Sequence, residues 1–501
     1  MKRLSHGIAF SPKGGHTMYI GVDLGSTNIK AAIYDKEFSL IDRQSRPVNY
    51  IRDNGFVEFD AVAYCNDLIG LLGDMMASNG VGHIDEISFT GQAESLVVLG
   101  ADGKPLMNAI SWMDERSVEE CKTLEAKFDS RTCEEITGQM AVLPTWPATK
   151  ILWLKHNRPE IYDDAATYML LKDYIVFCLT GEKKADMSIA TFSFYFDIYN
   201  KCYWKEMLEA IGVSESQLPQ LCEPCSVAGN LTAEVAEKMG LTTETRVNVG
   251  TLDHFAGMIG TGNIAPGGIT LSTGTVMALA TMGSAETAKG SGIAMHYGFL
   301  PDTHIMLPVA ESGGVSLEWF KRNCMTADYD TMNAELAKRG ESELIFLPYL
   351  VGTNAPEFDT QACGVFWGLR QEHDAIDMAG AVMEGVACVL RKNCDHIANN
   401  GVQLKTIIAT GGGAKSPIWC QLQADITGLP VSIPKEKEAA CLGAAMIAGV
   451  SHGRFESYQA AADHCVAMLH QYIPNPTAHT EKKYRRFCAL YKAALEIGNI
   501  E

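Results

Sequence analysis

Two short stretches, VDLGSTNIK at residues 22–30 and LSTGTVMAL at residues 271–279, place a Gly/Ser/Thr turn between strand-like runs in the same way. In the first, Tyr19–Asp23 is expected to form a strand and Ile29–Asp35 its antiparallel return, with residues 25–27 as the hairpin tip. Small residues there let an anion approach the backbone N–H groups. Either turn alone is typical of an ordinary hairpin, but the pair predicts a duplicated nucleotide clamp.

The composition is that of a large globular protein. The chain has 501 residues, of which 47% are hydrophobic, so it can bury a sizeable core and is expected to hold two or three domains. Sixty acidic against 41 basic residues give a formal net charge of -19. Because this excess repels nucleic acid and anionic membrane surfaces, we expect neither as a partner.

The 15 cysteines show no framework spacing, and their odd number in a long chain predicts reduced thiols in a cytoplasmic protein. The one C-x-x-C pair, Cys222 and Cys225, lacks a second pair at zinc spacing and is expected to be structural. Residues 1–17 are too polar for a signal-peptide core, and no apolar run reaches the length of a membrane span. We expect them to form a poorly ordered N-terminal extension, with Met18 as an alternative first residue.

A strand, a glycine turn and a helix follow one another late in the chain. Ile407–Thr410 is expected as a buried strand, GGGA at residues 411–414 as a tight turn and Pro417–Thr427 as a helix. This order is typical of a nucleotide site, but the turn matches neither the G-x-G-x-x-G of a Rossmann unit nor a Walker A loop. Alone, the segment fits a plain strand-to-helix turn equally well.

A glycine-rich stretch marks the expected division into domains. Asn248–Leu252 is a strand-like run that ends at Asp253, and we place the boundary just beyond it, with domains at residues 18–260 and 261–501. The aromatic run Thr191–Phe196 is expected as a further strand of the first domain. Three glycines beyond Asp253 would permit close packing or a hinge: Gly257, Gly260 and Gly262.

Taken together, the motifs resemble those of the FGGY carbohydrate kinases, a branch of the superfamily of actin, Hsp70 and the sugar kinases. The resemblance runs from about Met18 to Val450, and several motifs in the family's order are far more specific than any one alone. It implies an α/β protein with two ribonuclease-H-like (actin-like ATPase) domains flanking a catalytic cleft. The motifs are VDLGSTNIK (22–30), GQAES (91–95), WMDER (112–116), PATKILWL (147–154), GTLDHFAG (250–257), STGT (272–275), GVFWGL (364–369), DMAGAVMEG (377–385) and GGGAKSPIWCQLQADITGLPV (411–431).

The resemblance implies a carbohydrate kinase that transfers the γ-phosphoryl group of ATP to a hydroxyl of a free sugar or polyol, a ketose of the xylulose or ribulose type or an alditol. Asp253 is similar in position to the family's catalytic base, a carboxylate that accepts the proton of the attacking hydroxyl. Asp23 would hold Mg²⁺ through water, since hard cations prefer oxygen ligands. The alternative for Asp253 is a loop carboxylate that caps a helix.

The same resemblance implies an ATP site built from both domains. The first turn and Lys30 would neutralise the phosphates from one side, although a lysine on a return strand is often only a solvated residue. The second turn would face the β- and γ-phosphates from the other side, and the glycine turn would border the nucleoside. The implied ATP-contacting residues are Gly25, Ser26, Thr27, Lys30, Thr273, Gly274, Thr275, Gly314, Gly411, Gly412, Gly413 and Ser416.

Sugar recognition needs directional partners for hydroxyls and an aromatic face for the C–H side. The pattern departs from two branches of the family, because glycerol kinases have Arg where this chain has Ala93, and xylulokinases commonly have Gln-Met-His at residues 92–94. Trp112 fits a core residue as well, and Asp114 and Arg116 fit a mutual ion pair. The implied sugar-contacting residues are Gln92, Glu94, Trp112, Asp114, Arg116, Asp253 and His254.

Two other classes of function stay open from the sequence. One is a superfamily ATPase that uses the clamp for conformational work on a protein, against which the sugar-facing residues stand. The other is a non-catalytic sugar-binding regulator, against which the retention of Asp23 and Asp253 stands. A helical tail at residues 482–497 would pack on its own domain or against a second subunit in a homodimer through an apolar stripe: Tyr484, Phe487, Leu490, Tyr491 and Leu495.

Overall fold

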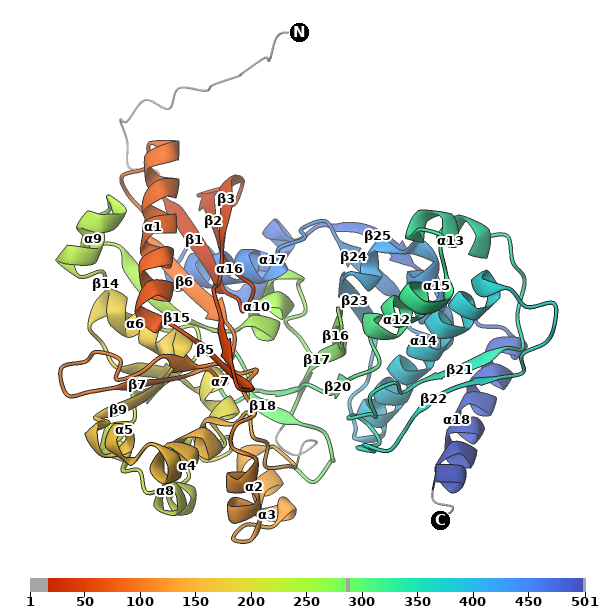
Figure 1. Cartoon of the computed structure of the whole chain (residues 1–501). Coiled ribbons are helices and arrows are strands. Elements are labelled where there is room, and N and C mark those ends of the chain that lie inside the picture. The colour runs from red at the N-terminus through yellow and green to blue at the C-terminus, as the bar shows by residue number, and fades with distance from the viewer. Residues whose placement is uncertain (1–16, 285–288, 499–501) are drawn as a thin grey trace.

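The structure, a computed structural model, describes residues 17–284 and 289–498, so most of the expected N-terminal extension lies outside it. It contains two α/β bodies side by side, each built around one large sheet (Figure 1). The first sheet has the order β14-β15-β6-β1-β2-β3. Its strands are β1 Met18–Leu24, β2 Asn28–Asp35, β3 Leu40–Pro47, β6 Glu86–Gly91, β14 Val227–Asn230 and β15 Arg246–Leu252, and helices near it are α1 Ala61–Asn79, α6 Leu171–Thr180, α9 Ala233–Met239 and α10 Asp253–Gly260.

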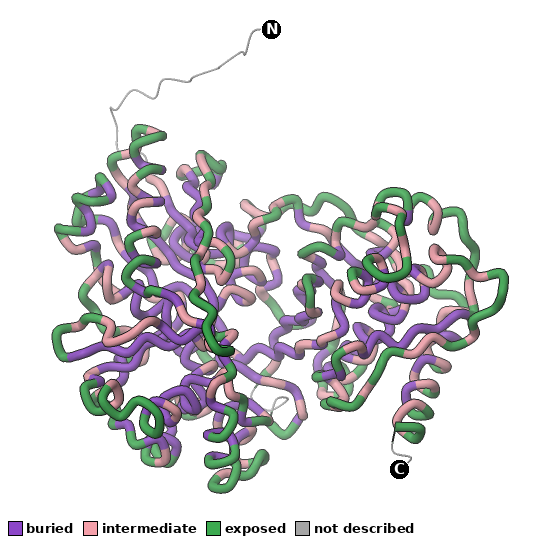
Figure 2. The backbone as a smooth tube through the Cα atoms, in the orientation of Figure 1, coloured by how far each residue is buried: buried purple, intermediate pink, exposed green. Residues whose placement is uncertain are grey.

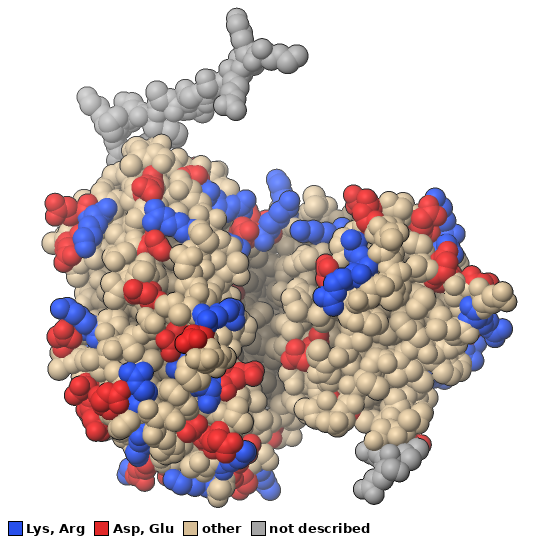
Figure 3. Space-filling model, viewed as in Figure 1, with Lys and Arg blue, Asp and Glu red and all other residues tan. Residues whose placement is uncertain are grey.

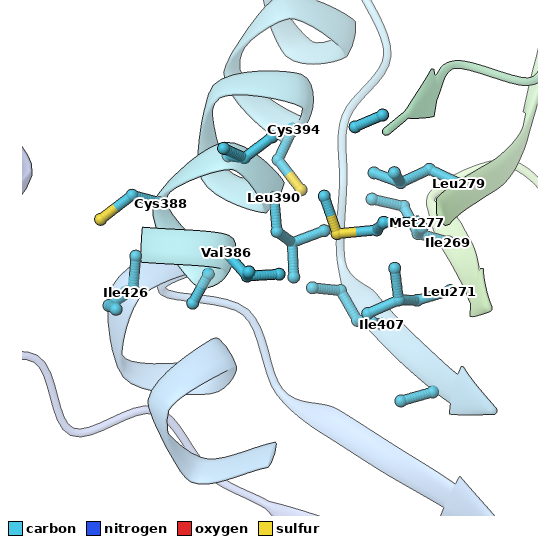
Figure 4. Packing of buried hydrophobic residues seen from close by; sticks show 14 of the residues in the cluster. Ile269, Leu271, Met277, Leu279, Val386, Cys388, Leu390, Cys394, Ile407 and Ile426 are labelled. Carbon is cyan, nitrogen blue, oxygen red and sulfur yellow. The ribbon is translucent and has the colours of Figure 1, made fainter. Parts of the chain in front are cut away.

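The sheet of the second body has the order β18-β19-β17-β16-β23-β24-β25, and β20 also pairs with β17. Apolar side chains of β16, β17 and β23 meet those of α14 in one buried cluster (Figure 4). The strands are β16 Gly268–Thr273, β17 Met277–Gly283, β18 Met295–Tyr297, β19 His304–Met306, β20 Val309–Ala310, β23 Thr406–Gly411, β24 Val431–Pro434 and β25 Met468–Tyr472, and the helices are α12 Gly314–Cys324, α13 Tyr329–Leu336, α14 Ala375–Asn399, α15 Pro417–Thr427 and α18 Ala478–Gly498.

A third sheet, of order β4-β5-β8-β7-β9, extends the first body. Buried residues follow the sheets of both bodies, while exposed residues follow the outer helices and loops (Figure 2). The other elements are β4 Ile51–Asp53, β5 Phe56–Phe59, β7 Leu96–Leu99, β8 Ala109–Ile110, β9 Thr167–Leu170, β10 Lys184–Asp186, β11 Phe196–Asp197, β12 Cys202–Tyr203, β13 Gln220–Cys222, β21 Ile345–Pro348, β22 Gly364–Trp367, α2 Val118–Glu125, α3 Ser130–Thr137, α4 Pro147–Asn157, α5 Pro159–Asp164, α7 Met187–Ala190, α8 Lys205–Ile211, α16 Ala439–Ser451 and α17 Tyr458–Cys465, with 3₁₀ turns at Thr191–Ser193, Glu215–Gln217 and Gly413–Lys415.

The two large sheets repeat one arrangement around the two Gly/Ser/Thr turns. In the first, β1 pairs antiparallel with β2 and parallel with β6. In the second, β16 pairs antiparallel with β17 and parallel with β23. The hairpin expected with its tip at residues 25–27 is therefore present, and so is its copy in the second sheet.

Helix α16 comes late in the chain but packs on the first body, where Figure 1 shows it in blue beside the orange strands. It approaches so closely that a Cβ on Gly21 of β1 would lie 1.9 Å from the carbonyl oxygen of Cys441. A Cβ on Gly260 of α10 would lie 1.9 Å from the carbonyl oxygen of Ala439, and a Cβ on Gly443 would be as close to α10. Of the two roles expected for the glycines beyond Asp253, Gly260 therefore has close packing.

Helix α18 packs on the second body through its apolar stripe. Phe487 and Tyr491 are buried in the same core as α14 and β21. The guanidinium of Arg391 on α14 lies 3.9 Å from the ring centre of Tyr484. Packing of the tail on its own domain, one of the two expectations, is thus confirmed.

In the run Thr191–Phe196, Thr191–Ser193 form a 3₁₀ turn and only Phe196 lies in a strand, β11, so the expectation of a strand over the whole run was wrong. The hydroxyl of Thr191 donates to the carbonyl oxygen of Met187 at 3.1 Å, which continues α7 into that turn. Phe194 has a φ of 66° and stacks on Trp146, with ring centres 5.7 Å apart. Burial of these rings in a local core overrides the strand preference of aromatic residues.

Between residues 17 and 284 and between 289 and 498, no helix combines the length and the apolar character that crossing a membrane requires. In the same segments, no three His, Cys, Asp or Glu side chains are placed to hold a metal ion together. The cysteines, including Cys222 and Cys225, are free thiols.

Candidate active site

Two aspartates lie at one edge of the first sheet. Asp23 is near the end of β1 and Asp253 directly follows β15, and both strands run parallel to β6. Burial, and then the charge of Asp253, raise the pKa of Asp23 to about 7. The two carboxylates therefore share one site. A deep groove separates the two bodies in the space-filling view (Figure 3).

The side chain of Lys30 pairs with a carboxylate from the far end of the chain. Its Nζ donates to Oε2 of Glu438 at 2.7 Å, across from β2 to the residue before α16. Each side chain is about one third exposed, at 33% and 31%. Glu438 was not among the expected site residues, because 408 positions separate it from Lys30. In this structure the lysine expected at the phosphates is thus already engaged.

Gln92 links the first turn to the expected sugar side. Its Nε2 donates to the carbonyl oxygen of Gly25 at 3.4 Å, and its Oε1 accepts from the Ser95 hydroxyl at 3.0 Å. The same hydroxyl accepts from the backbone N–H of Trp112 at 3.0 Å. Trp112 is 39% exposed, so the core alternative for it does not hold.

Glu94 occupies a strained position beside a buried lysine. Its φ is 64°, a left-handed value that side chains other than Gly rarely adopt. Burial raises the pKa of Glu94 to about 7, although the charge of Lys150 acts to lower it. Lys150 is fully buried, and its Nζ donates to the carbonyl oxygens of Glu94 at 3.0 Å and of Ser111 at 2.8 Å. Lys150 belongs to the PATKILWL stretch, but its place beside Glu94 was not anticipated.

Asp114 and Arg116 form the mutual ion pair that was the alternative to sugar contact. Arg116 Nε donates to Asp114 Oδ1 at 2.8 Å, and both side chains are almost fully buried. Arg116 also donates to Glu58 at 2.8 Å, and its guanidinium lies 4.0 Å from the ring centre of Phe56. Burial would raise the pKa of Asp114, but the hydrogen bonds from Arg116 and from the Val57 N–H lower it overall. The pair therefore holds the segment that carries Trp112 against strand β5.

Two histidines, one from each body, act on one another electrostatically near Asp253. The backbone N–H of His254 donates to Oδ1 of Asp253 at 2.6 Å. His296, on β18, is buried and stacks on Phe192 with ring centres 4.4 Å apart. Burial, and then the proximity of His254, lower the pKa of His296 to about 3. His296 was missed from the sequence, because strand β18 carries no motif.

Three glycine-containing segments converge at the second turn. Thr273 is opposite Gly411 in the parallel ladder, and a Cβ on Gly411, whose φ is 78°, would lie 2.7 Å from the Thr273 carbonyl oxygen. The N–H of Gly314, at the start of α12, donates to the carbonyl oxygen of Gly274 at 2.8 Å. The Thr273 hydroxyl is buried and has no hydrogen-bond partner among the described residues. The structure thus brings together these expected ATP-contacting residues.

Ser416 has a local role in starting α15. Its Oγ accepts from the N–H of Trp419 at 3.3 Å and donates to Oδ1 of Asn333 at 2.9 Å, while Pro417 occupies the first turn. Of the other expected ATP contacts, the exposed ones are Thr27, Gly274, Thr275, Gly411 and Gly412, and the less exposed ones are Gly25, Ser26, Gly314 and Gly413.

A duplicated α/β body with a hairpin turn at each sheet and a groove between the bodies defines the actin-like class of two-domain ATPases. The chain belongs to the FGGY family of carbohydrate kinases, whose N-terminal domain matches residues 18–260 and whose C-terminal domain matches residues 272–452. The fold class expected from the sequence is confirmed.

Similar proteins cover nearly the whole chain. The xylulose kinase of Lactococcus lactis is 31% identical over 96% of this chain and 98% of its own. The xylulose kinase of Bacillus subtilis is 29% identical over 94% and 95%. The crystal structure of ligand-bound xylulose kinase from Lactobacillus acidophilus superposes with a TM-score of 0.86 at 26% identity, covering 96% and 98%.

These findings make the chain a carbohydrate kinase, which phosphorylates a sugar or polyol with ATP. They favour that activity over the two alternatives, an ATPase that does conformational work and a non-catalytic regulator.

Proposed function

We propose that the chain phosphorylates a hydroxyl of an uncharged ketose or alditol, with Asp253 as the general base. The observation that carries this proposal is the pair of carboxylates, Asp23 and Asp253, whose mutual repulsion contributes to a pKa of about 7 at Asp23. In phosphoryl transfer the protein must accept a proton from the attacking hydroxyl and neutralise the phosphates. Two carboxylates at one sheet edge suit these two tasks.

Asp253 is the better placed of the two to accept the proton. It is the first residue of α10, only partly buried, and its Oδ1 accepts from the backbone N–H of His254, which orients it. A carboxylate held in this way can take the proton as the hydroxyl approaches phosphorus. His254 and the exposed ring of Trp112 would hold the sugar beside it.

Asp23 suits Mg²⁺ held through water. A carboxylate whose pKa is raised by burial and by a second carboxylate is stabilised by a divalent cation nearby, so the residues present fit the ion. When bound, Mg²⁺ would neutralise charge on the transferred phosphoryl group. The turn at Thr273, with its unpartnered hydroxyl, would contact the phosphates from the second body.

The substrate class follows from Glu94 and from the similar proteins. When ionised, the partly buried carboxylate of Glu94 at the expected sugar position repels a sugar acid, while a sugar hydroxyl can donate to it. Several of the similar proteins are xylulose kinases, which supports a ketose. The chain has Ala93 and Glu94 where xylulokinases commonly have Met and His, so we keep alditols in the proposal.

ADP release should be measured with Mg²⁺·ATP alone and with D-xylulose, D-ribulose, xylitol, ribitol, glycerol and gluconate. We expect release to rise by at least about tenfold over the sugar-free rate with one ketose or alditol and to stay at that rate with gluconate. A preference for gluconate would contradict the uncharged substrate. With the best substrate, Asp23→Asn should raise the Mg²⁺ concentration needed for half-maximal rate, and an unchanged Mg²⁺ dependence would remove Asp23 from that role.

A further inference from the structure

A buried charged cluster lies behind the expected catalytic edge and has no part in the chemistry described so far. Lys172 and Asp173, in the first turn of α6, and Asp186, at the end of β10, are all at most 2% exposed. Lys172 forms an ion pair with Asp186, and its Nζ donates to the carbonyl oxygen of Val249 on β15 at 2.5 Å. The cluster therefore contacts the strand that leads to Asp253.

The charges of this cluster reduce to one ion pair near neutral pH. Burial raises the pKa of Asp173 to about 8, so this carboxyl is mainly protonated at pH 7. Burial would lower the pKa of Lys172, but Asp186 and then Asp173 raise it overall. A buried ion pair is rarely more stable than apolar side chains of the same size. A contribution to the stability of the fold therefore does not by itself account for the buried ion pair of Lys172 and Asp186.

Asp186 connects the ion pair to the end of β15 through Ser188. Asp186 accepts the N–H of Ser188 at 2.9 Å and also the Ser188 hydroxyl. The oxygen of that hydroxyl accepts from the N–H of Leu252 at 3.2 Å and lies 2.9 Å from the hydroxyl of Thr251. A serine hydroxyl has one donor and two acceptor positions, so all three are used. The next residue in the chain is Asp253.

The end of β15 needs such support because its ladder is interrupted. The pairing with β6 passes from Asn248 opposite Ser88 to Thr251 opposite Thr90, so β15 carries one extra residue there. Gly250 has a φ of 64°, and a Cβ on it would lie 1.6 Å from the Phe89 carbonyl oxygen. Bulges of this kind redirect the side chains that follow. The groups held by the cluster lie within the bulge, at the Val249 carbonyl, and just beyond it, at the Leu252 N–H.

We propose that Lys172, Asp186 and Ser188 are positioning residues for Asp253: they hold the bulge and the last residues of β15, and so fix the direction of the Asp253 carboxylate. None of the three is expected to touch substrate. The inference rests on the proposed role of Asp253 as the base.

Ser188→Ala in the full-length chain removes the link while leaving the ion pair. We expect kcat to fall by about tenfold or more, with KM for ATP and sugar changed by less than about threefold, since the carboxylate is misdirected but the binding groups stay. The matched control is Thr245→Val, which removes a buried hydroxyl bonded to the Ile84 carbonyl oxygen at the other end of β15 and should leave kcat within about twofold.

The deciding measurement is a double-mutant cycle with Asp253→Asn. If Ser188 acts through Asp253, Ser188→Ala should lower kcat by less than about twofold in the Asp253→Asn background. Equal falls in both backgrounds would overturn the positioning role and leave a structural one. If Ser188→Ala does not fold, Thr251→Val, which removes one partner of the Ser188 hydroxyl, replaces it in the same cycle. A normal kcat in Asp253→Asn would overturn the proposed role of Asp253 as the base. If kcat falls in Asp253→Asn but not in Ser188→Ala, only the positioning role of Ser188 is overturned.

Discussion

The two turns of the molecule share a backbone and differ in chemistry. In the first, Asp23 is opposite Lys30 across the hairpin, and in the second the equivalent pair is Ser272 and Ala278. A Cβ on Gly274 would meet nothing within 4 Å, so the second turn is open at its tip. The first turn therefore has charged side chains beside it, whereas the second has only uncharged residues at the equivalent positions.

Both bodies share the close approach of a parallel strand to the turn: β6 beside β1 in the first sheet, and β23 beside β16 in the second. A Cβ on Gly91, at the end of β6, would lie 2.6 Å from the Leu24 Cβ, and one on Gly411, at the end of β23, would lie 2.7 Å from the Thr273 carbonyl oxygen. The backbone around each turn is fixed by such contacts, while its side chains are free to diverge.

The largest effect should come from a substitution in the first body, which carries the charged groups of the site. Asp253→Asn should lower kcat by about a hundredfold or more and leave ATP affinity nearly unchanged, because it removes the proton acceptor but little volume. Steady-state kinetics with the best sugar and ATP titration test this. Asp163→Asn, on an exposed site, is the control and should stay within about twofold. Near-normal kcat in Asp253→Asn would contradict the assignment of the proton acceptor to the first body.

His296, where the second body meets the first, should make stability depend on pH. Its pKa is about 3 in the folded chain against 6.5 ordinarily, so below pH 6.5 the unfolded chain binds the extra proton and stability falls as pH falls. Between pH 7.5 and 5 this costs about 2 kcal/mol, or roughly thirtyfold in the folding equilibrium. Urea unfolding at both values should show that His296→Gln loses about this much less than the parent. An identical loss in both proteins would refute the neutral, buried state of this histidine.

The backbone around the second turn can be tested at Gly411, which lies opposite Thr273. Gly411→Ala should raise the KM for ATP about tenfold without changing that for sugar, because it strains a positive φ and crowds Thr273. Gly340→Ala, at an exposed position outside the expected ATP site, is the control, since a Cβ there would meet nothing within 4 Å, and it should change KM by less than about twofold. Equal effects of the two changes would mean that the shared backbone is not what binds ATP.

The smallest effect is expected at the ion pair of the first turn. Lys30→Met should raise the KM for ATP by at most about fivefold and Glu438→Gln should lower it slightly, because a partly exposed pair is worth about 1 kcal/mol or less. The two KM values, measured at low and at physiological salt, decide between a phosphate contact and a merely structural pair. A rise in both variants would favour the structural pair.

Sequence analysis predicted the features that depend on local signals. The hairpin at residues 25–27 and the helix at Pro417–Thr427 follow from small residues, glycines and a cap that lie next to one another. The expectation for Thr191–Phe196 failed because burial of the aromatic rings, such as Phe194 against Trp146, decided the backbone.

The candidate site was predicted less completely, for a related reason. Glu438 and His296 reach it from elements without a motif, and their partners are far away in sequence. Lys150 belongs to a recognised motif, but only the fold shows that it lies beneath Glu94. Spacing along a chain cannot show which buried charges will meet.

The docking of α16 against Gly21 and Gly260 also bears on how the chain is made. The first sheet is complete when residue 252 has been synthesised, but the helix that packs against β1 and β6 is residues 439–451. During synthesis on the ribosome, the surfaces of β1 and α10 that α16 will cover therefore remain exposed to water until nearly two hundred further residues have been added. We expect the amino-terminal part alone to be prone to aggregation, and chaperones to be needed until the late helix arrives.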